Sequence, residues 1–123
     1  MPNIVTLYHS GYGHTKKLAE NIHVGIKETA NINAHLLAID PEGNLSEDGW
    51  QAFLNADTII FGSPTYMGGV YWQFKKFADA SSKVWMQQLW KDKLAAGFTN
   101  SGSMNGNKLS TLQYIFTLLC NTQ

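Results

Sequence analysis

Three segments of this chain combine glycine with small hydroxyl and amide side chains, a composition suited to binding a polar ligand through backbone groups. The first is Ser10-Gly11-Tyr12-Gly13-His14-Thr15. Its glycines can adopt positive φ and let the backbone approach a ligand closely. Amide N–H groups at the start of a following helix attract anions, because the helix dipole lies behind them. The hydroxyls of Ser10 and Thr15 can add two donors, so the segment suits a terminal phosphate monoester held without arginine.

Other phosphate-binding motifs fit this segment poorly. Lys16 stands where a dinucleotide fingerprint needs its third glycine, and the Gly-Lys-Ser/Thr of a Walker A loop is absent. A thiol phosphatase needs a loop cysteine and an arginine, but the single cysteine is Cys120 and the chain has no arginine. The alternative explanation, a tight turn that caps the next helix, uses the same residues and stays open.

Two later segments could surround a flat ring. Ser63-Pro64-Thr65-Tyr66-Met67-Gly68-Gly69 can set backbone N–H groups against a polar ring edge, with an aromatic or thioether side chain beside the ring face. Asn100-Ser101-Gly102-Ser103-Met104-Asn105-Gly106 could complete a wall around the same ring. Taken separately, the former could equally be an ordinary strand-to-helix connection, and the latter is better explained as a surface loop.

The stretches between these loops alternate between strand-like and helix-like patterns. Apolar, β-branched runs predict four strands, at Asn3–Tyr8, Asn33–Ile39, Asp57–Gly62 and Lys93–Thr99. Strands that alternate with helices at this spacing imply βαβ units and a parallel sheet, so the fold class is α/β. The loops after the first, third and fourth strands would meet at the carboxyl edge of that sheet, where open α/β sheets bind ligands. The three segments therefore predict one convergent site.

Apolar spacing predicts the helices between the strands. Thr15 can cap the first helix, which fades near Asn31, and a turn at Asp40–Asn44 closes the second strand. Further helices are expected around Trp50–Leu54, from Val70 to about Gln88, and from Leu109 onward. Leu18, Ile22 and Ile26 share one face of the first helix, and Trp50, Phe53 and Leu54 indicate the second. The expected core contacts of the third helix are Phe74, Phe77, Val84 and Trp85, and the expected buried stripe of the last is Leu109, Leu112, Phe116 and Leu119.

Overall composition narrows the class of protein. The 123 residues are 44% hydrophobic and 15% charged, which is typical of a globular chain. Nine lysines balance nine acidic residues, so the chain lacks the basic field of a nucleic-acid-binding protein and the acidic surplus of an electrostatically steered carrier. One cysteine cannot form an internal disulfide, and no apolar run is long enough to span a bilayer. These features exclude a secreted disulfide scaffold, a membrane protein and a zinc module, and favour the cytoplasm.

Together the three segments resemble the flavodoxin-like fold and, within it, the WrbA family of FMN-dependent NAD(P)H:quinone oxidoreductases. The matching stretches are Tyr8–Thr15, Gly62–Gly69, and Lys93–Thr99 with the loop that follows. The resemblance implies FMN as cofactor, NAD(P)H as electron donor, a quinone or similar small acceptor and a homo-oligomer. It implies no metal and no catalytic side chain, because flavin N5 carries the hydride.

The resemblance also assigns cofactor-binding residues by position. The phosphate loop falls on Ser10, Gly11, Tyr12, Gly13, His14 and Thr15. The loop that flanks the isoalloxazine falls on Pro64, Thr65, Tyr66, Met67, Gly68 and Gly69. The third flavin-contacting loop falls on Thr99, Asn100, Ser101, Gly102 and Ser103. Of the four histidines only His14 is expected near the site, and Tyr12, Tyr66 and Trp85 could line its open face.

Two departures from the family pattern bear on these expectations. Tyr66-Met67-Gly68-Gly69 stands where the family commonly has an Arg-Phe-Gly-Asn turn, so an aromatic contact and an asparagine side chain are missing. The family also continues with a fifth strand and a final helix. The expectation is one flavodoxin-like domain over residues 1–123, C-terminally short, whose strand order 2-1-3-4 leaves the fourth strand at an exposed edge. The missing element could have been removed, omitted, or supplied by another chain.

Three functions are compatible with these residues. In the first, an FMN-dependent quinone reductase, a nicotinamide delivers hydride to the flavin, leaves, and is replaced by the quinone. The second is a one-electron carrier like flavodoxin, which the neutral net charge disfavours because such carriers use an acidic surface for steering. The third is a flavin-free interaction module that uses the exposed sheet edge.

Overall fold

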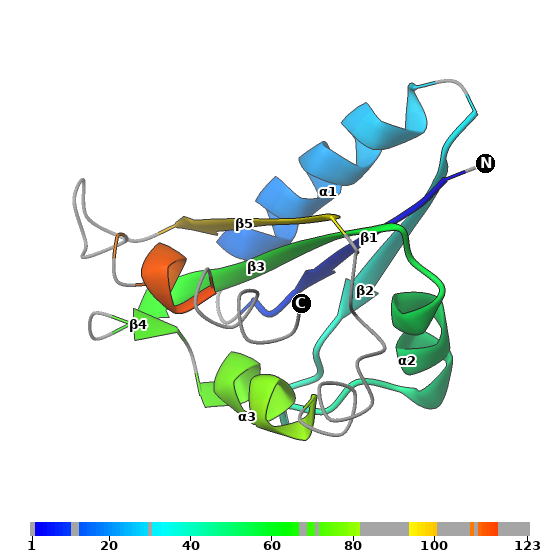
Figure 1. Cartoon of the computed structure of the whole chain (residues 1–123). Coiled ribbons are helices and arrows are strands. Elements are labelled where there is room, and N and C mark those ends of the chain that lie inside the picture. The colour runs from blue at the N-terminus through cyan, green and yellow to red at the C-terminus, as the bar shows by residue number, and fades with distance from the viewer. Residues whose placement is uncertain are drawn as a thin grey trace.

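Four parallel strands build the sheet that positions the candidate site. The computed structural model describes residues 2–10, 13–29, 31–66, 69–70, 72–81, 94–100, 109 and 111–115. β1 (Asn3–Tyr8) lies between β2 (Asn33–Ala38) and β3 (Thr58–Tyr66), and β5 (Leu94–Asn100) pairs with the other side of β3 (Figure 1). The parallel order is therefore β2-β1-β3-β5. This confirms the predicted α/β fold with order 2-1-3-4, in which β5 is the fourth predicted strand.

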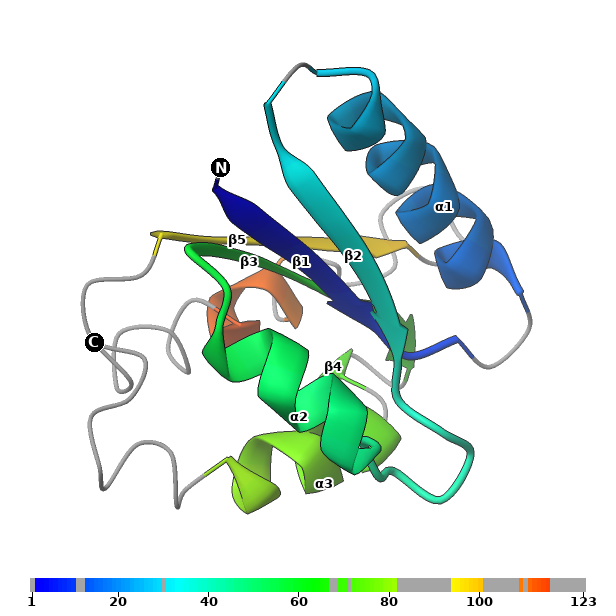
Figure 2. The ribbon, with the colours of Figure 1, turned by 90° about the vertical axis from the view of Figure 1, so that its right-hand side faces the viewer.

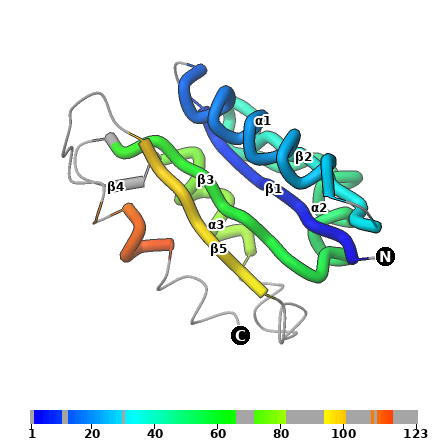
Figure 3. The backbone as a smooth tube through the Cα atoms, turned by 90° about the horizontal axis from the view of Figure 1, so that it is seen from above, coloured from blue at the N-terminus to red at the C-terminus, as the bar shows by residue number. Residues whose placement is uncertain are grey.

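Helices cover both faces of the sheet. α1 (His14–Lys27) packs over β1 and β2 on one face. α2 (Glu47–Leu54) and α3 (Trp72–Ala80) lie on the opposite face, as Figure 2 and Figure 3 show from two directions. A helical segment at residues 111–115 adds Ile115 to the core on the side of α2 and α3.

The main core lies between the sheet and α2 with α3. The strands contribute Val5, Leu7, Ile59 and Phe61, and the helices contribute Phe53, Phe74 and Phe77. Trp50 stacks on Phe77 with ring centroids 5.2 Å apart. Aromatic rings of this size each bury about 150–250 Å², so they dominate the packing energy of the interface. The predicted core positions Phe74 and Phe77 are confirmed, and on α2 Phe53 is buried while Trp50 is partly buried against the same cluster.

The turn after β2 is held against α3. Asp40 Oδ1 accepts the backbone N–H groups of Glu42 at 3.0 Å and of Asn44 at 2.8 Å. Gly43 has φ 82°, a conformation that favours glycine. Lys76 Nζ then donates to the Glu42 carbonyl at 2.8 Å and fastens the turn to the helix. The predicted turn at Asp40–Asn44 is confirmed.

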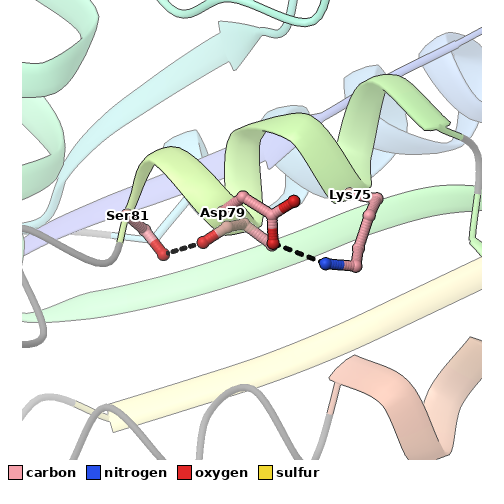
Figure 4. Close-up of polar contacts among 4 residues, drawn as sticks. Lys75, Asp79 and Ser81 are labelled. Atoms are coloured by element: carbon pink, nitrogen blue, oxygen red, sulfur yellow. Dashed lines mark hydrogen bonds and ion pairs between the residues drawn. The ribbon is translucent and has the colours of Figure 1, made fainter.

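Two short-range polar contacts lie in the second half of α3 and just after its end (Figure 4). Lys75 Nζ and Asp79 Oδ1 form an ion pair at 2.5 Å, with side chains 51% and 66% exposed. Ser81 Oγ donates to the Ala78 carbonyl at 2.5 Å just after the last helical residue. An exposed i,i+4 ion pair such as that of Lys75 and Asp79 contributes little to stability, so we assign it no functional role.

β3 is longer than the sequence predicted. The prediction ended this strand at Gly62 and treated Ser63–Gly69 as a loop, but the strand continues to Tyr66. Ser63 pairs with Thr99 of β5, and the last residues of β3 pair antiparallel with β4 (Gly69–Val70). Because Val70 belongs to β4, α3 begins at Trp72, two residues later than predicted. β5 likewise extends by one residue, so that Asn100 ends a strand rather than opening a loop.

The helical segment at 111–115 buries a different face from the predicted one. Thr111 and Ile115 are buried, whereas Leu109 and Leu112 are 65% and 39% exposed. The reason is the shape of β5, because Ile115 occupies the space beside Gly97, where a Cβ would lie 2.7 Å from Ile115 Cγ2. The other predicted buried positions in the C-terminal third, Val84, Trp85, Phe116 and Leu119, lie outside the described residues.

Candidate site at the carboxyl edge of the sheet

The ends of β1, β3 and β5 lie side by side at one edge of the sheet. Tyr8 of β1 pairs with Gly62 of β3, and Gly62 pairs in turn with Phe98 of β5. The segments that leave these strands therefore start next to one another, as expected for the ligand edge of an open parallel sheet.

The first predicted loop ends in an uncapped helix start. Gly13 is the N-cap residue of α1, with φ 93° and no side-chain cap. The backbone N–H of Gly13 donates to Ser10 Oγ at 2.9 Å. The first turn of α1 holds no acidic residue, while Lys16 and Lys17 are exposed there. Because the first N–H groups of a helix have no intrahelical acceptor, this end of α1 is suited to an anion.

Thr15 does not cap α1, contrary to the prediction. It lies inside the helix and is buried, while the cap position belongs to Gly13. Its hydroxyl donates to Oδ1 of Asn100 at 2.5 Å, across 85 positions of sequence. Thr15 therefore joins the first predicted loop to the start of the third.

This bond also fixes the side-chain amide of Asn100. Since Oδ1 accepts the Thr15 proton, the Nδ2 group with its two N–H donors is the other branch of the planar amide and does not take part in this bond. Asn100 is partly buried at the end of β5. The sheet edge therefore presents a neutral donor group that a lysine could not replace without adding charge.

Hydroxyl contacts join the second predicted loop to the third. Thr65 Oγ1 lies 2.8 Å from Thr99 Oγ1 and 2.8 Å from Thr111 Oγ1. Thr99 Oγ1 donates to the Ser63 carbonyl at 2.6 Å. The sequence does not single out Thr111, because the apolar residues of this segment predict a buried stripe that passes through Leu112. The signal that could have found it is the i,i+4 spacing of Thr111 and Ile115.

Gly62 gives Phe98 the room to lie across the sheet beside the site. A Cβ at Gly62 would lie 2.1 Å from Cζ of Phe98 and 2.5 Å from its Cε1. Phe98 is partly buried, two residues before Asn100. The ring therefore covers the backbone of β3 directly before the segment predicted to flank a ligand ring.

Burial shifts the pKa values of Tyr8 and His9, at the end of β1, in the directions that favour their neutral forms. Burial raises the pKa of the Tyr8 hydroxyl, and the charge of Glu20 raises it further. Burial lowers the pKa of His9, which is 3% exposed and whose backbone N–H donates to the Gly62 carbonyl at 3.1 Å. His14, the histidine expected near the site, is exposed in the first turn of α1. Sequence reasoning therefore overlooked His9 as the buried residue next to Ser10.

The structure brings part of the predicted site together. Ser10 contacts Gly13, Thr15 contacts Asn100, and Thr65 contacts Thr99. The backbones of Pro64, Tyr66 and Gly69 belong to β3 and β4. The remaining predicted residues lie outside the described residues: Gly11, Tyr12, Met67, Gly68, Ser101, Gly102 and Ser103. The cofactor-binding roles of all these residues stay predictions.

Two general features of the described residues complete the geometry. No group of three or more His, Cys, Asp or Glu side chains among them is placed to hold a metal ion. None of the helices they form is both long and apolar enough to cross a membrane.

An open parallel sheet of this order, with polar segments converging at its carboxyl edge, defines a flavodoxin-like protein. The family model described as NADPH-dependent FMN reductase matches residues 12–119, and the chain belongs to this family. The resemblance to WrbA-type proteins is confirmed by this match and by a close structural relative. The family name agrees with the predicted cofactors, FMN and NAD(P)H.

Known relatives divide between two descriptions. Flavodoxin FldP of Pseudomonas aeruginosa is 48% identical over 118 residues, which are 96% of this chain and 61% of that protein. An NAD(P)H dehydrogenase (quinone) of Geobacter sulfurreducens is 28% identical over 135 residues, covering 95% of this chain and 66% of that protein. The crystal structure of a WrbA-like flavodoxin from Agrobacterium tumefaciens has a TM-score of 0.92 at 58% identity, covering 99% of this chain and 74% of that one. The chain thus spans less than two thirds of the length of these curated relatives.

Proposed function

We propose that this chain binds FMN at the carboxyl edge formed by β1, β3 and β5, and uses it to reduce quinones with NAD(P)H. Membership of the FMN reductase family supports the choice of cofactor. The observation that carries the proposal is the bond from Thr15 to Asn100, which joins the segment suited to a phosphate to the segment suited to a ring. The contact between Thr65 and Thr99 adds the second ring-flanking segment to the same site.

The start of α1 fits the FMN phosphate. Lysines in the first turn of a helix, with no acidic residue beside them, oppose the helix dipole. A bound phosphate dianion offsets this unfavourable interaction between the lysines and the helix dipole, because the dianion is attracted both by the N–H groups of the first turn and by Lys16 and Lys17. The Ser10 hydroxyl already accepts the Gly13 N–H, so its own proton can be donated to a phosphate oxygen.

The ends of β3 and β5 fit the flavin ring. Pro64 and Thr65 on β3, and Thr99 and Asn100 on β5, bring no formal charge to the ring edge. When bound, FMN supplies the chemistry of accepting a hydride from NAD(P)H and passing it to a two-electron acceptor. The chain orients the ring between these strand ends, and the Asn100 Nδ2 donors lie free of the Thr15 bond for a ring or phosphate oxygen. The proposal assigns no catalytic side chain.

A flavodoxin-like electron carrier is the second candidate. The 48% identity to flavodoxin FldP favours it, since that relative is more similar than the quinone dehydrogenases. Both candidates need the same FMN site and differ in what happens after reduction. Rapid NAD(P)H oxidation in the presence of a quinone supports the reductase. An FMN-loaded chain that NAD(P)H does not reduce, but that exchanges single electrons with a redox partner, supports the carrier.

The experiment that tests FMN binding is a titration of the purified chain with FMN, following flavin fluorescence. The expected result is saturable quenching at one FMN per chain. Riboflavin, which lacks the phosphate, should bind more weakly than FMN. Ser10→Ala removes a proposed phosphate donor, so it should reduce the difference in affinity between FMN and riboflavin. A folded chain that quenches neither flavin contradicts the proposal. The FMN-loaded chain is then assayed for quinone-dependent oxidation of NADH and NADPH.

Two further parts of the proposal concern the whole protein. We place it in the cytoplasm as a homo-oligomer, following the absence of disulfide pairing and the WrbA resemblance. Light scattering coupled to size-exclusion chromatography, with and without FMN, measures the assembly directly.

A further inference from the structure

We propose that Thr111 is a positioning residue for the flavin site, because its hydroxyl starts a directed chain of hydrogen bonds that locks the end of β3 to the end of β5. This inference rests on the proposed function, since the segments it fixes are those proposed to hold the FMN ring. Thr111 itself lies in the helical segment at 111–115, outside the three predicted loops.

The direction of the chain follows from counting protons. The Thr99 hydroxyl donates its single proton to the Ser63 carbonyl at 2.6 Å. Its 2.8 Å contact with Thr65 must therefore be donated by Thr65. Thr65 then has no proton left for its 2.8 Å contact with Thr111, so Thr111 is the donor there. The chain runs from Thr111 to Thr65, from Thr65 to Thr99, and from Thr99 to the Ser63 carbonyl.

The hydrogen-bond chain is fully buried at its two ends and partly buried in its middle. Thr111 and Ser63 are fully buried, and Thr65 and Thr99 are partly buried. Hydrogen bonds in series polarise one another in such surroundings, and losing one partner leaves a buried polar atom unpaired. Removing the Thr111 proton should therefore loosen the whole chain and not only its first bond.

Thr111 and Asn100 also delimit the third predicted loop. Asn100, at its start, is bound to Thr15 at the beginning of α1. Thr111, after its end, is bound to Thr65 near the end of β3. Both ends of the intervening segment are thus fastened to the other two segments of the site.

The same proton count predicts which part of FMN depends on Thr111. The hydroxyl protons of Thr65 and Thr99 are both donated within the hydrogen-bond chain, so these hydroxyls can only accept hydrogen bonds from a ligand. They can meet a ring N–H but cannot donate to a phosphate oxygen. The phosphate therefore depends on the start of α1, and the effect of Thr111 should appear in the affinity for the ring.

The test compares Thr111→Val, which keeps the shape and removes the donor, with Thr111→Ser, which keeps the hydroxyl. Thr6→Val is the matched control, because Thr6 is fully buried in β1 under α1 and its hydroxyl has no partner among the described residues. Dissociation constants for FMN and for riboflavin are measured by fluorescence quenching on the full chain. The visible absorbance bands of bound flavin are recorded, and circular dichroism checks folding.

We expect Thr111→Val to weaken FMN and riboflavin by about the same factor, on the order of tenfold, with shifted absorbance bands. Thr111→Ser and Thr6→Val should bind both flavins as the unchanged chain does. Equal affinity in Thr111→Val, or an equal loss in Thr111→Ser, overturns the role of the hydroxyl. If Thr111→Val does not fold, Thr111→Cys replaces it, and its weaker donor should give an intermediate affinity rather than an unchanged one.

The outcome also separates this inference from the proposed function. An unchanged chain that binds no flavin overturns the proposed function, and the positioning role with it. An unchanged chain that binds FMN, beside a folded Thr111→Val variant that binds it equally well, overturns the positioning role alone. A loss confined to FMN, with riboflavin unaffected, contradicts the assignment of Thr111 to the ring.

Discussion

The hydroxyl of Thr15 and the side-chain amide of Asn100 meet at 2.5 Å, at the junction of α1 with the end of β5. This contact crosses the sheet edge from β1 to β5, because the helix that follows β1 starts above the strand ends. It ties a residue predicted to bind phosphate to a residue predicted to line a ring. One hydrogen bond therefore links the two chemistries that an FMN site needs.

Asn100→Asp should weaken FMN binding by about tenfold or more, while riboflavin loses less. The new carboxylate can still accept the Thr15 proton, but it replaces the Nδ2 donors with a negative charge near the proposed phosphate. Fluorescence titration with both flavins measures the two constants. Asn33→Asp is the charge-matched control, since Asn33 is exposed at the start of β2, at the opposite edge of the sheet. Equal losses for the two Asp variants would contradict a local charge effect.

Thr6→Val should stabilise the folded chain by about 1 kcal/mol. The Thr6 hydroxyl is fully buried and has no partner among the described residues, so folding removes it from water without replacing its hydrogen bonds. Valine has nearly the same shape and is well suited to a strand. Urea denaturation followed by circular dichroism gives the free energy of unfolding. A destabilised Thr6→Val variant would mean that the hydroxyl has a partner in solution, for example a bound water.

Local pattern was sufficient for the elements whose packing repeats at short range. β1 was predicted residue for residue, because Asn3–Tyr8 is a run of buried and half-buried residues bounded by turn residues. The turn at Asp40–Asn44 was predicted because Asp, Pro and Gly each have a local role in it. The end of β3 was wrong, since its last residues are strand only by virtue of pairing with β5 and β4, which are distant or very short.

The site shows the same division. Glycine and hydroxyl content placed the three segments at one edge, because parallel strands put their carboxyl ends together. The partners of individual side chains could not be predicted. Threonine is a residue type that often caps helices, but the Thr15 hydroxyl donates to Asn100. Thr111 was missed because only the Gly97 surface decides which face of its helix is buried.

Gly97→Ala should destabilise the folded chain by about 1–3 kcal/mol. A Cβ at Gly97 would lie 2.7 Å from Ile115 Cγ2, and Ile115 is both buried and β-branched, so it cannot swing aside. Gly25→Ala is the matched control, because nothing lies within 4 Å of a Cβ at Gly25, which is exposed in α1. Alanine in a helix interior should stabilise by about 0.5–1 kcal/mol. Denaturation midpoints of the two variants should therefore shift in opposite directions.

His9 should make stability fall as the pH drops below about 6.5. Burial lowers the pKa of His9 in the folded chain below its ordinary value of 6.5, although a hydrogen bond to the Ile39 backbone acts in the opposite direction. Between the two pKa values the unfolded chain binds more protons than the folded one, so the free energy of unfolding rises with pH there. The contribution is complete above about pH 6.5, and it is lost as the pH falls through the lowered pKa.

The measurement is the free energy of unfolding by urea at several pH values between 5 and 8, for the unchanged chain and for His9→Gln. We expect His9→Gln to reduce the dependence on pH in this range. His23→Gln serves as the comparison: the pKa of His23 is also lowered, by desolvation first and then by the charges of Lys27 and His35, but its side chain is only half-buried. It should therefore change the slope less than His9→Gln does. A His9→Gln variant that keeps the full slope would show that the imidazole next to the proposed phosphate loop is protonated as easily in the folded chain as in the unfolded one.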